Sequence, residues 1–239
     1  MSTRPFGLLI IVFLSLNCKS SQFGIPVSET SGEILGQYHP ETRWIGFTKN
    51  QNPKLSELSH FPNLEILELS SSEIESIDAL PELPKLRFIN LNHTNVKRFE
   101  VLEKFPKLDS LILNGTQVDD SDLALFHSWN RLTRLELNDT KVTNLNFLVP
   151  GCSLRRLHLR HTKIEDISPV SNCVFLKELY LGGTLVQDLK PLASVSGLYH
   201  LQLDGTNVSN EEIASLRKQL PYLKIFPGLR KIFLSETGQ

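Results

Sequence analysis

Apolar residues recur along this chain at a nearly constant interval from residue 42 onward. Counting the first residue of each unit gives Thr42, Leu64, Leu86, Leu108, Leu132, Leu154, Leu176 and Leu198, with a last fragment from Leu223. The spacings are therefore 22, 22, 22, 24, 22, 22, 22 and 25 residues. A period of this length predicts a stack of similar coils, because each unit is too short to form a core of its own.

Inside each unit, two further apolar positions alternate with polar ones. Position 4 holds Ile45, Leu67, Ile89, Leu111, Leu135, Leu157, Leu179 and Leu201, and position 6 holds Phe47, Leu69, Leu91, Leu113, Leu137, Leu159, Leu181 and Leu203. Side chains two apart in a strand point to the same face, so positions 4 and 6 predict a short strand with one buried face. Stacking the coils would lay these strands side by side in a parallel sheet.

The rest of the unit predicts turns and short convex segments. Position 9 carries a hydroxyl in successive units, at Ser72, Thr94, Thr116, Thr140, Thr162, Thr184 and Thr206, and we expect these hydroxyls to bond to the backbone of neighbouring coils. Proline in convex segments such as 167–170 and 189–192 favours 3₁₀ turns or extended pieces over long helices. The two longer units predict helices over 121–128 and 209–220, the second opened by a capping box of Ser209 and Glu212.

Over residues 42 to about 228, the chain resembles bacterial leucine-rich-repeat proteins with 22-residue, internalin-like units. The resemblance implies an α/β solenoid, a horseshoe or arc with a parallel β-sheet on its concave face and mostly 3₁₀ or short helical convex segments. Eight units would occupy 42–222, and residues 223–239 would form a C-terminal cap fragment. Threonine in place of asparagine at position 9 is the main departure. The family binds proteins, and some members bind host-cell receptors.

The N-terminus predicts export. Arg4 is followed by an apolar run of ten residues from Gly7 to Leu16. This run is too short for a membrane-spanning helix, and it fits a signal peptide over 1–17. Cys18 directly follows this segment and resembles the lipidated cysteine of spirochaete-type lipoproteins, although Asn17 departs from the usual small residue. Residues 18–41 would then be a lipidated tether and an N-terminal cap. The alternative is a general secretory signal in which Cys18 is incidental.

Strand side chains that point away from the core would line the concave face, which repeat proteins commonly use for binding. Two groups of such residues are candidates for contact with a partner. One is the apolar group Ile66, Phe88 and Ile112; the other is the basic and aromatic group Arg134, Arg156, His158, Arg160, Tyr180 and His200. Exposed apolar clusters often mark interaction sites, and arginine and tyrosine are favoured interface residues.

Two further cysteines, Cys152 and Cys173, fall near the same position of adjacent coils. Adjacent coils could bring their Cα atoms within disulfide range, and export would permit the bond. The alternative is two buried thiols that serve as small apolar residues.

Composition limits the chemistry that the chain could perform. A net charge of −1 gives no reason to expect nucleic acid as a partner. The sequence lacks the G-x-S-x-G, H-E-x-x-H and glycine-rich phosphate-loop motifs, and its histidines have no four-ligand spacing. We therefore expect neither an enzyme nor a metal or cofactor site.

Together these features predict a monomeric protein-binding module, anchored by lipid to the cell envelope at the outer membrane. Surface display with binding of host proteins is the sharper version of this hypothesis. The alternative is a periplasmic or structural scaffold that binds a partner from the same cell or associates with itself.

Overall fold

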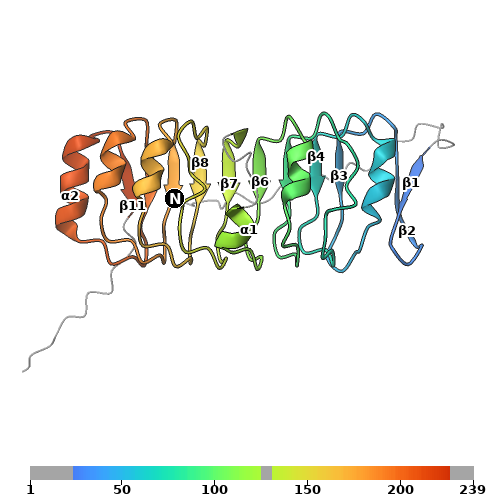
Figure 1. Ribbon diagram of the computed structural model, residues 1–239, viewed down its shortest axis with the longest axis horizontal. Helices are drawn as coiled ribbons and strands as arrows, with labels where there is room; N and C mark the ends of the chain where they lie inside the picture. The colour runs from blue at the N-terminus through green and yellow to red at the C-terminus, as the bar shows by residue number, and fades with distance from the viewer. Residues whose placement is uncertain (1–23, 125–130, 227–239) are drawn as a thin grey trace, which may run out of the picture.

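The computed structural model describes residues 24–124 and 131–226, and its coils stack along one long axis (Figure 1). Nine strands form one parallel sheet in the order β3 to β11, each strand beside the next along the chain. These strands are β3 (Trp44–Gly46), β4 (Ile66–Glu68), β5 (Phe88–Asn90), β6 (Ser110–Ile112), β7 (Arg134–Glu136), β8 (Arg156–His158), β9 (Glu178–Tyr180), β10 (His200–Gln202) and β11 (Lys224–Phe226). The predicted solenoid with a parallel sheet is confirmed.

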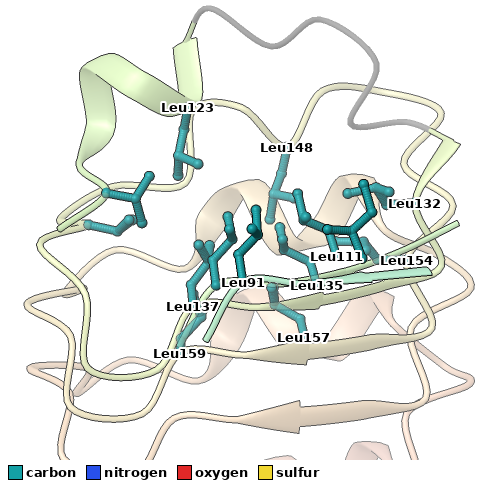
Figure 2. Packing of buried hydrophobic residues seen from close by; sticks show 14 of the residues in the cluster. Leu91, Leu111, Leu123, Leu132, Leu135, Leu137, Leu148, Leu154, Leu157 and Leu159 are labelled. Atoms are coloured by element: carbon teal, nitrogen blue, oxygen red, sulfur yellow. The ribbon is translucent and has the colours of Figure 1, made fainter. Parts of the chain in front are cut away.

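The core is a set of apolar columns that run the length of the stack. Position 4 forms one of them, because Ile45, Leu67 and Ile89 face each other in register and the same pairing continues to Ile225 in β11. This register puts the first position of the last fragment at Tyr222, so its expected start at Leu223 was wrong by one residue. Figure 2 shows leucines from neighbouring coils packed between the sheet and the convex segments. Each coil thus buries its leucines only against its neighbours, so the core is continuous.

The convex side is built mostly from 3₁₀ turns, and they lie on the opposite side of the stack from the sheet (Figure 1). The 3₁₀ segments are Leu55–His60, Glu100–Lys104, Ser168–Asn172 and Lys190–Ser194. The first predicted helix begins at α1 (Asp120–Ala124), and the remainder of that prediction lies outside the described residues. The second is α2 (Asn210–Gln219).

The N-terminal cap of α2 differs from the predicted capping box. The Ser209 hydroxyl accepts a hydrogen bond from the backbone N–H of Glu212 at 3.1 Å, as expected. The Glu212 carboxylate accepts from the backbone N–H of Leu189, in the preceding coil, also at 3.1 Å. The glutamate therefore ties the helix to its neighbouring coil, because stacking brings an unpaired N–H closer than the start of its own helix.

A β-hairpin covers the first coil. It consists of β1 (Ile25–Ser28) and β2 (Ile34–Tyr38), which pair in antiparallel orientation. Val27 is fully buried, and the Tyr38 ring meets Phe61 edge-on with centroids 6.0 Å apart. The Glu57 carboxylate accepts from the backbone N–H of Ser28 at 2.7 Å. These contacts close the end of the core that faces β3.

The hydroxyl column at position 9 acts differently from our expectation. Each hydroxyl donates to the position-6 carbonyl of its own coil, as Thr94 does to Leu91 at 2.8 Å, and the same bond recurs from Ser72 to Thr206. The expected bonds to neighbouring coils were wrong at this position. A residue with positive φ at position 8, such as His93, folds the turn so tightly that the nearest acceptor lies three residues back.

Asparagines at position 7 link the coils instead. The Asn92 side-chain carbonyl accepts from the backbone N–H of Asn114, that of Asn114 accepts from Asn138, and that of Asn138 accepts from Arg160, each at 2.8 Å. These side chains supply acceptors that the turns between strands would otherwise lack.

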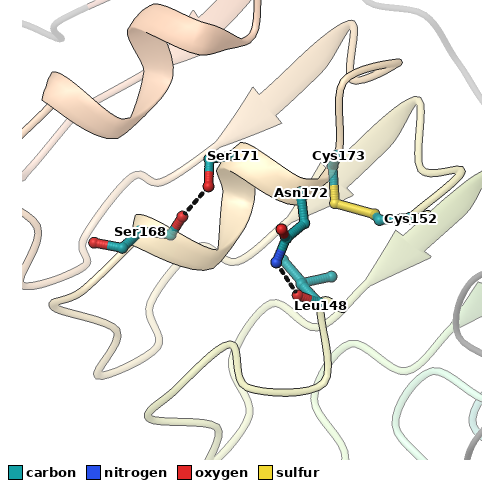
Figure 3. The surroundings of a disulfide bond; sticks show 6 residues. All are labelled: Leu148, Cys152, Ser168, Ser171, Asn172 and Cys173. Atoms are coloured by element: carbon teal, nitrogen blue, oxygen red, sulfur yellow. Dashed lines mark hydrogen bonds between the residues drawn. A yellow bond between two sulfur atoms is a disulfide. The ribbon is translucent and has the colours of Figure 1, made fainter. Parts of the chain in front are cut away.

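Of the two arrangements open for Cys152 and Cys173, the structure contains the disulfide (Figure 3). Their Cα atoms are 4.7 Å apart, and both residues are buried. The bond joins two adjacent coils where their convex segments end, since Cys173 directly follows the 3₁₀ segment Ser168–Asn172. Next to it, the Asn172 side-chain amide donates to the Leu148 carbonyl at 2.7 Å (Figure 3).

The signal peptide predicted over 1–17, the lipidation site at Cys18 and most of the fragment 223–239 lie outside the described residues. In the part that the structure does describe, no helix is long and apolar enough to cross a membrane.

Candidate binding face

Three columns of side chains cover the concave face, at positions 3, 5 and 7 of each coil. The in-register pairing of β3 to β11 places equivalent residues of neighbouring coils side by side, about 4.8 Å apart. All nine candidate residues of the sequence analysis lie in these columns, but they do not form the two groups that were expected.

The apolar group on the concave face differs from the predicted one by two residues, since Trp44 belongs to it and Ile112 does not. Trp44, Ile66 and Phe88 face each other in register at position 3 of β3, β4 and β5. Trp44 is 54% exposed and Ile66 is 37% exposed. Ile112 lies at position 5 of β6 and is only 3% exposed, so it was wrongly placed in an exposed patch. Position 5 is the middle column, where side chains of both flanking columns cover a residue of modest length.

Trp44 was absent from the sequence-based candidates, although its register position would have identified it. Its indole ring lies over Gly46, since a Cβ on that glycine would come within 2.7 Å of the ring. The missing side chain at Gly46 lets the tryptophan lie along the strand. The exposed apolar run is therefore Trp44–Ile66–Phe88, which we call the apolar run.

The arginines of the second group are not free cations, because each is held by a carboxylate. Arg134 donates to Glu136 from Nε at 2.8 Å and also from Nη2. Arg156 donates to both carboxylate oxygens of Glu178 at 2.8 Å. The three arginines of this group are thus members of ion pairs rather than free basic side chains.

Glu178 is the most strongly stabilised carboxylate of the face. Tyr199 donates its hydroxyl to Glu178 at 2.6 Å, and Tyr180 does so at 3.1 Å. The hydrogen bond from Arg156, with those from the two tyrosines, outweighs burial and lowers the pKa of Glu178 to about 2. The carboxylate is therefore charged throughout the physiological range.

The third arginine pairs across a whole coil. Arg160 Nη2 lies 3.1 Å from Asp204 Oδ2, and the two residues are 44 positions apart. Gly182 lies between them in the position-7 column, and a Cβ there would come within 2.6 Å of Asp204 Oδ1. The glycine therefore makes room for an ion pair that bridges its coil.

His158 is the most enclosed titratable group among the candidates. Burial, with the nearby arginines Arg134 and Arg156, outweighs the attraction of Glu136 and lowers the pKa of His158 to about 4. The ring is therefore neutral at pH 7. Its Nε2 is buried and has no hydrogen-bond partner among the described residues. Burial raises the pKa of Glu136, but the charge that His158 carries in acid, with the hydrogen bonds from Asn114 and Arg134, holds that pKa below its usual value.

An aromatic stack crosses the last strands. The ring centroids of His158 and Tyr180 are 4.1 Å apart, those of Tyr180 and His200 are 4.9 Å apart, and those of His200 and Phe226 are 4.7 Å apart. Phe226 is 47% exposed at the end of the sheet. The structure thus joins three of the predicted residues into one row and extends it with Phe226.

Within residues 24–124 and 131–226, no group of three or more histidine, cysteine or acidic side chains is placed to hold a metal ion. The arginines and carboxylates of the concave face instead form hydrogen bonds and ion pairs with one another. Such a face can recognise another surface by shape, charge and apolar contact.

Comparison with protein families supports the repeat assignment for part of the chain. The family model described as leucine-rich repeats (two copies) matches residues 152–194. No curated protein matches the chain.

Solved structures share the fold. An internalin (inlF) from Listeria monocytogenes matches with a TM-score of 0.62 and 20% identity, over 74% of this chain and 51% of that one. Internalin C2 from the same species matches with a TM-score of 0.64 and 23% identity, over 77% and 79% of the two chains. A leucine-rich-repeat protein from Leptospira interrogans matches with a TM-score of 0.55 and 21% identity, over 74% and 51%.

This chain therefore spans about half the length of the first and third of these structures. At these identities the likeness concerns the fold. The fold is that of a leucine-rich-repeat solenoid, and the resemblance inferred from the repeats is confirmed to that extent.

Proposed function

We propose that the protein is a recognition module that binds another protein on its concave face, without catalysing a reaction. The observation that carries this proposal is the apolar run. A folded chain that buries its leucines in a continuous core nevertheless leaves Trp44 and Ile66 exposed beside Phe88, in one column of the sheet. Exposed apolar clusters of this kind commonly mark contact surfaces.

We further propose that the protein is exported and held at the cell envelope as a lipoprotein through Cys18. The apolar segment Gly7–Leu16 followed at once by Asn17-Cys18 supports this part of the proposal. The buried disulfide between Cys152 and Cys173 is compatible with an oxidising compartment. Display on the cell surface, with a host protein as the partner, is the sharper form of this proposal.

Photo-cross-linking tests the concave face directly. A benzoylphenylalanine placed at Phe88 would be compared with one at Leu185, which is 48% exposed and lies outside the three concave columns. The purified full chain would be mixed separately with the envelope fraction of its own cells and with host surface proteins. We expect a discrete adduct from position 88 alone, lost when Trp44→Ser and Ile66→Ser are introduced. Equal labelling from both positions, or none, would contradict the proposal.

The identity of the adduct separates the alternatives. An adduct with a host protein supports surface recognition, and one with an envelope protein supports the periplasmic scaffold. An adduct of twice the chain mass would point to self-association.

Localisation is tested by protease digestion of intact and lysed cells, followed by detection of this protein and an internal control. Digestion in intact cells with the control spared would support surface display. Protection until lysis would exclude it. Retention of label from a radioactive fatty acid by the wild type, and its loss in Cys18→Ser, would support lipidation.

A further inference from the structure

Charges at position 2, along the edge where each strand begins, are paired in the first coils and unpaired later. In the first coils, Arg43 pairs with Glu65 at 3.5 Å, and Arg87 with Asp109 at 2.6 Å. The same position then holds Arg155 and Lys177 in adjacent coils, bonded backbone to backbone at 2.8 Å. Within the described residues, neither of these side chains has a carboxylate partner.

The neighbouring column adds two more cations. Arg134 and Arg156 face each other at position 3 of β7 and β8. Each donates to its carboxylate from Nε and Nη2, so the Nη1 group of each has no partner among the described residues. Four cationic side chains thus lie together where the carboxylates Glu136 and Glu178 can neutralise only two.

These side chains line a hollow of about 420 Å³. Its wall includes Arg134, Arg155, Arg156, Lys177, Glu178 and Tyr199. Like charges facing each other on adjacent strands repel, so the arrangement opposes folding unless something offsets it. An anion in the hollow would reduce that repulsion and could accept charge-assisted hydrogen bonds from the free Nη1 groups.

We propose that this hollow, which we call the cationic hollow, receives acidic side chains from the protein partner whose apolar side chains cover the apolar run. The inference rests on the proposed function, since it concerns the same bound partner. The cations extend over β7 to β9, about 10 Å at strand spacing, which is wider than one small anion. Several carboxylates on one segment would match that width.

The position of the apolar run supports a single partner segment. Phe88 and Arg134 occupy the same column, two strand spacings apart through Ser110. That separation is about 10 Å, which roughly three extended residues span. A segment lying across the strands would therefore place apolar residues on β3 to β5 and, after a short spacer, acidic residues on β7 to β9.

A labelled peptide tests this arrangement with the full chain. The probe carries Leu-Phe-Leu, a Gly-Ser-Gly spacer and four glutamates, and its comparator carries four glutamines in their place. Fluorescence anisotropy at low ionic strength should show binding at least tenfold tighter for the glutamate probe. Added salt should reduce this difference, because ion pairs at an open surface are screened.

Paired variants show whether the hollow is responsible. Arg155→Gln with Lys177→Gln should remove the preference for glutamate. Lys141→Gln with Lys163→Gln changes the net charge equally, in adjacent coils, at exposed positions outside the hollow, and should leave the preference intact. The first variant should also melt at the same or a slightly higher temperature than wild type, since it relieves repulsion without touching the core.

Three results would overturn the inference. They are equal binding of both probes, equal loss of the glutamate preference in both paired variants, or displacement of the probe by sulfate at concentrations at which sulfate itself binds to the hollow. The last would indicate a site for small anions. If the cross-link at position 88 still forms while the glutamate preference is absent, the recognition proposal stands and only the acidic partner fails. Absence of both would end both proposals.

Discussion

His158 illustrates how neighbouring side chains on the concave face control the pKa of a residue. Its pKa of about 4 lies below the value of about 6.5 for an unfolded histidine. Between these values the unfolded chain binds more protons than the folded one. The contribution of His158 to stability is therefore complete above pH 6.5 and is lost as the pH falls toward 4.

We therefore expect the free energy of unfolding to decrease as the pH is lowered through this window, and to do so less steeply in His158→Gln. Urea denaturation at several pH values measures it. His161→Gln is the control, because it removes an exposed histidine from the same coil without touching the buried ring of His158. A wild-type slope equal to that of His158→Gln would show that the ring is protonated normally.

Gly182 shows that the absence of a side chain can be a structural requirement. We expect Gly182→Ala to lower the free energy of unfolding by about 1 kcal/mol, because the new Cβ displaces Asp204 from Arg160. In the background of Asp204→Ala the same change should cost less, as the two residues are coupled. Additive costs in this double-mutant cycle would mean that the glycine acts independently of the ion pair.

At the scale of the element, the asparagines of position 7 stabilise the coil-to-coil contact. Asn114→Ala removes the acceptor for the backbone N–H of Asn138 and the donor to Glu136. We expect a loss of about 1–3 kcal/mol, because a buried polar group left unpaired is costly. Denaturant unfolding compares it with Asn207→Ala, at an exposed position. A loss no larger than in the control would exclude the role proposed for this column.

The disulfide between Cys152 and Cys173 also links adjacent coils, by a covalent bond in place of the asparagine hydrogen bonds. Its cysteines are 21 residues apart, and closing a loop of that size stabilises a fold by about 3 kcal/mol. We expect Cys152→Ala with Cys173→Ala to unfold at lower denaturant concentration than wild type, and reductant to shift wild type but not the variant. A reductant effect on both proteins would have another origin.

At the scale of the whole molecule, stability depends on contacts between neighbouring coils, so damage at one end should remain local. Val27→Asp would place a charge in the buried contact between the β1–β2 hairpin and the first coil. We expect hydrogen exchange to speed up in β3 and β4 while β9 and β10 keep their protection. Val149→Asp, at a position that is 48% exposed, is the control. Uniform loss of protection would indicate that the solenoid unfolds as one unit.

The repeats made the fold predictable from the sequence, because the same apolar positions recur in each unit and each recurrence indicates the same strand and turn. The parallel strands, the 3₁₀ segments near 167–170 and 189–192 and α2 all followed from that pattern. The candidate face was only partly predictable. Its columns were identified, but the burial of Ile112, the exposure of Trp44 and the carboxylate held by each arginine were not.

The sequence by itself determined the period, the buried columns and the order of strands, because these depend on spacing along the chain. Only the tertiary structure decided which hydroxyl bonds to its own coil, which asparagine bonds to the next, and that Arg160 reaches Asp204 over Gly182. Those outcomes depend on distances between residues at least one whole coil apart, or on the handedness of a turn. A pattern of residue types fixes which side chains share a column, whereas packing fixes which of them touch.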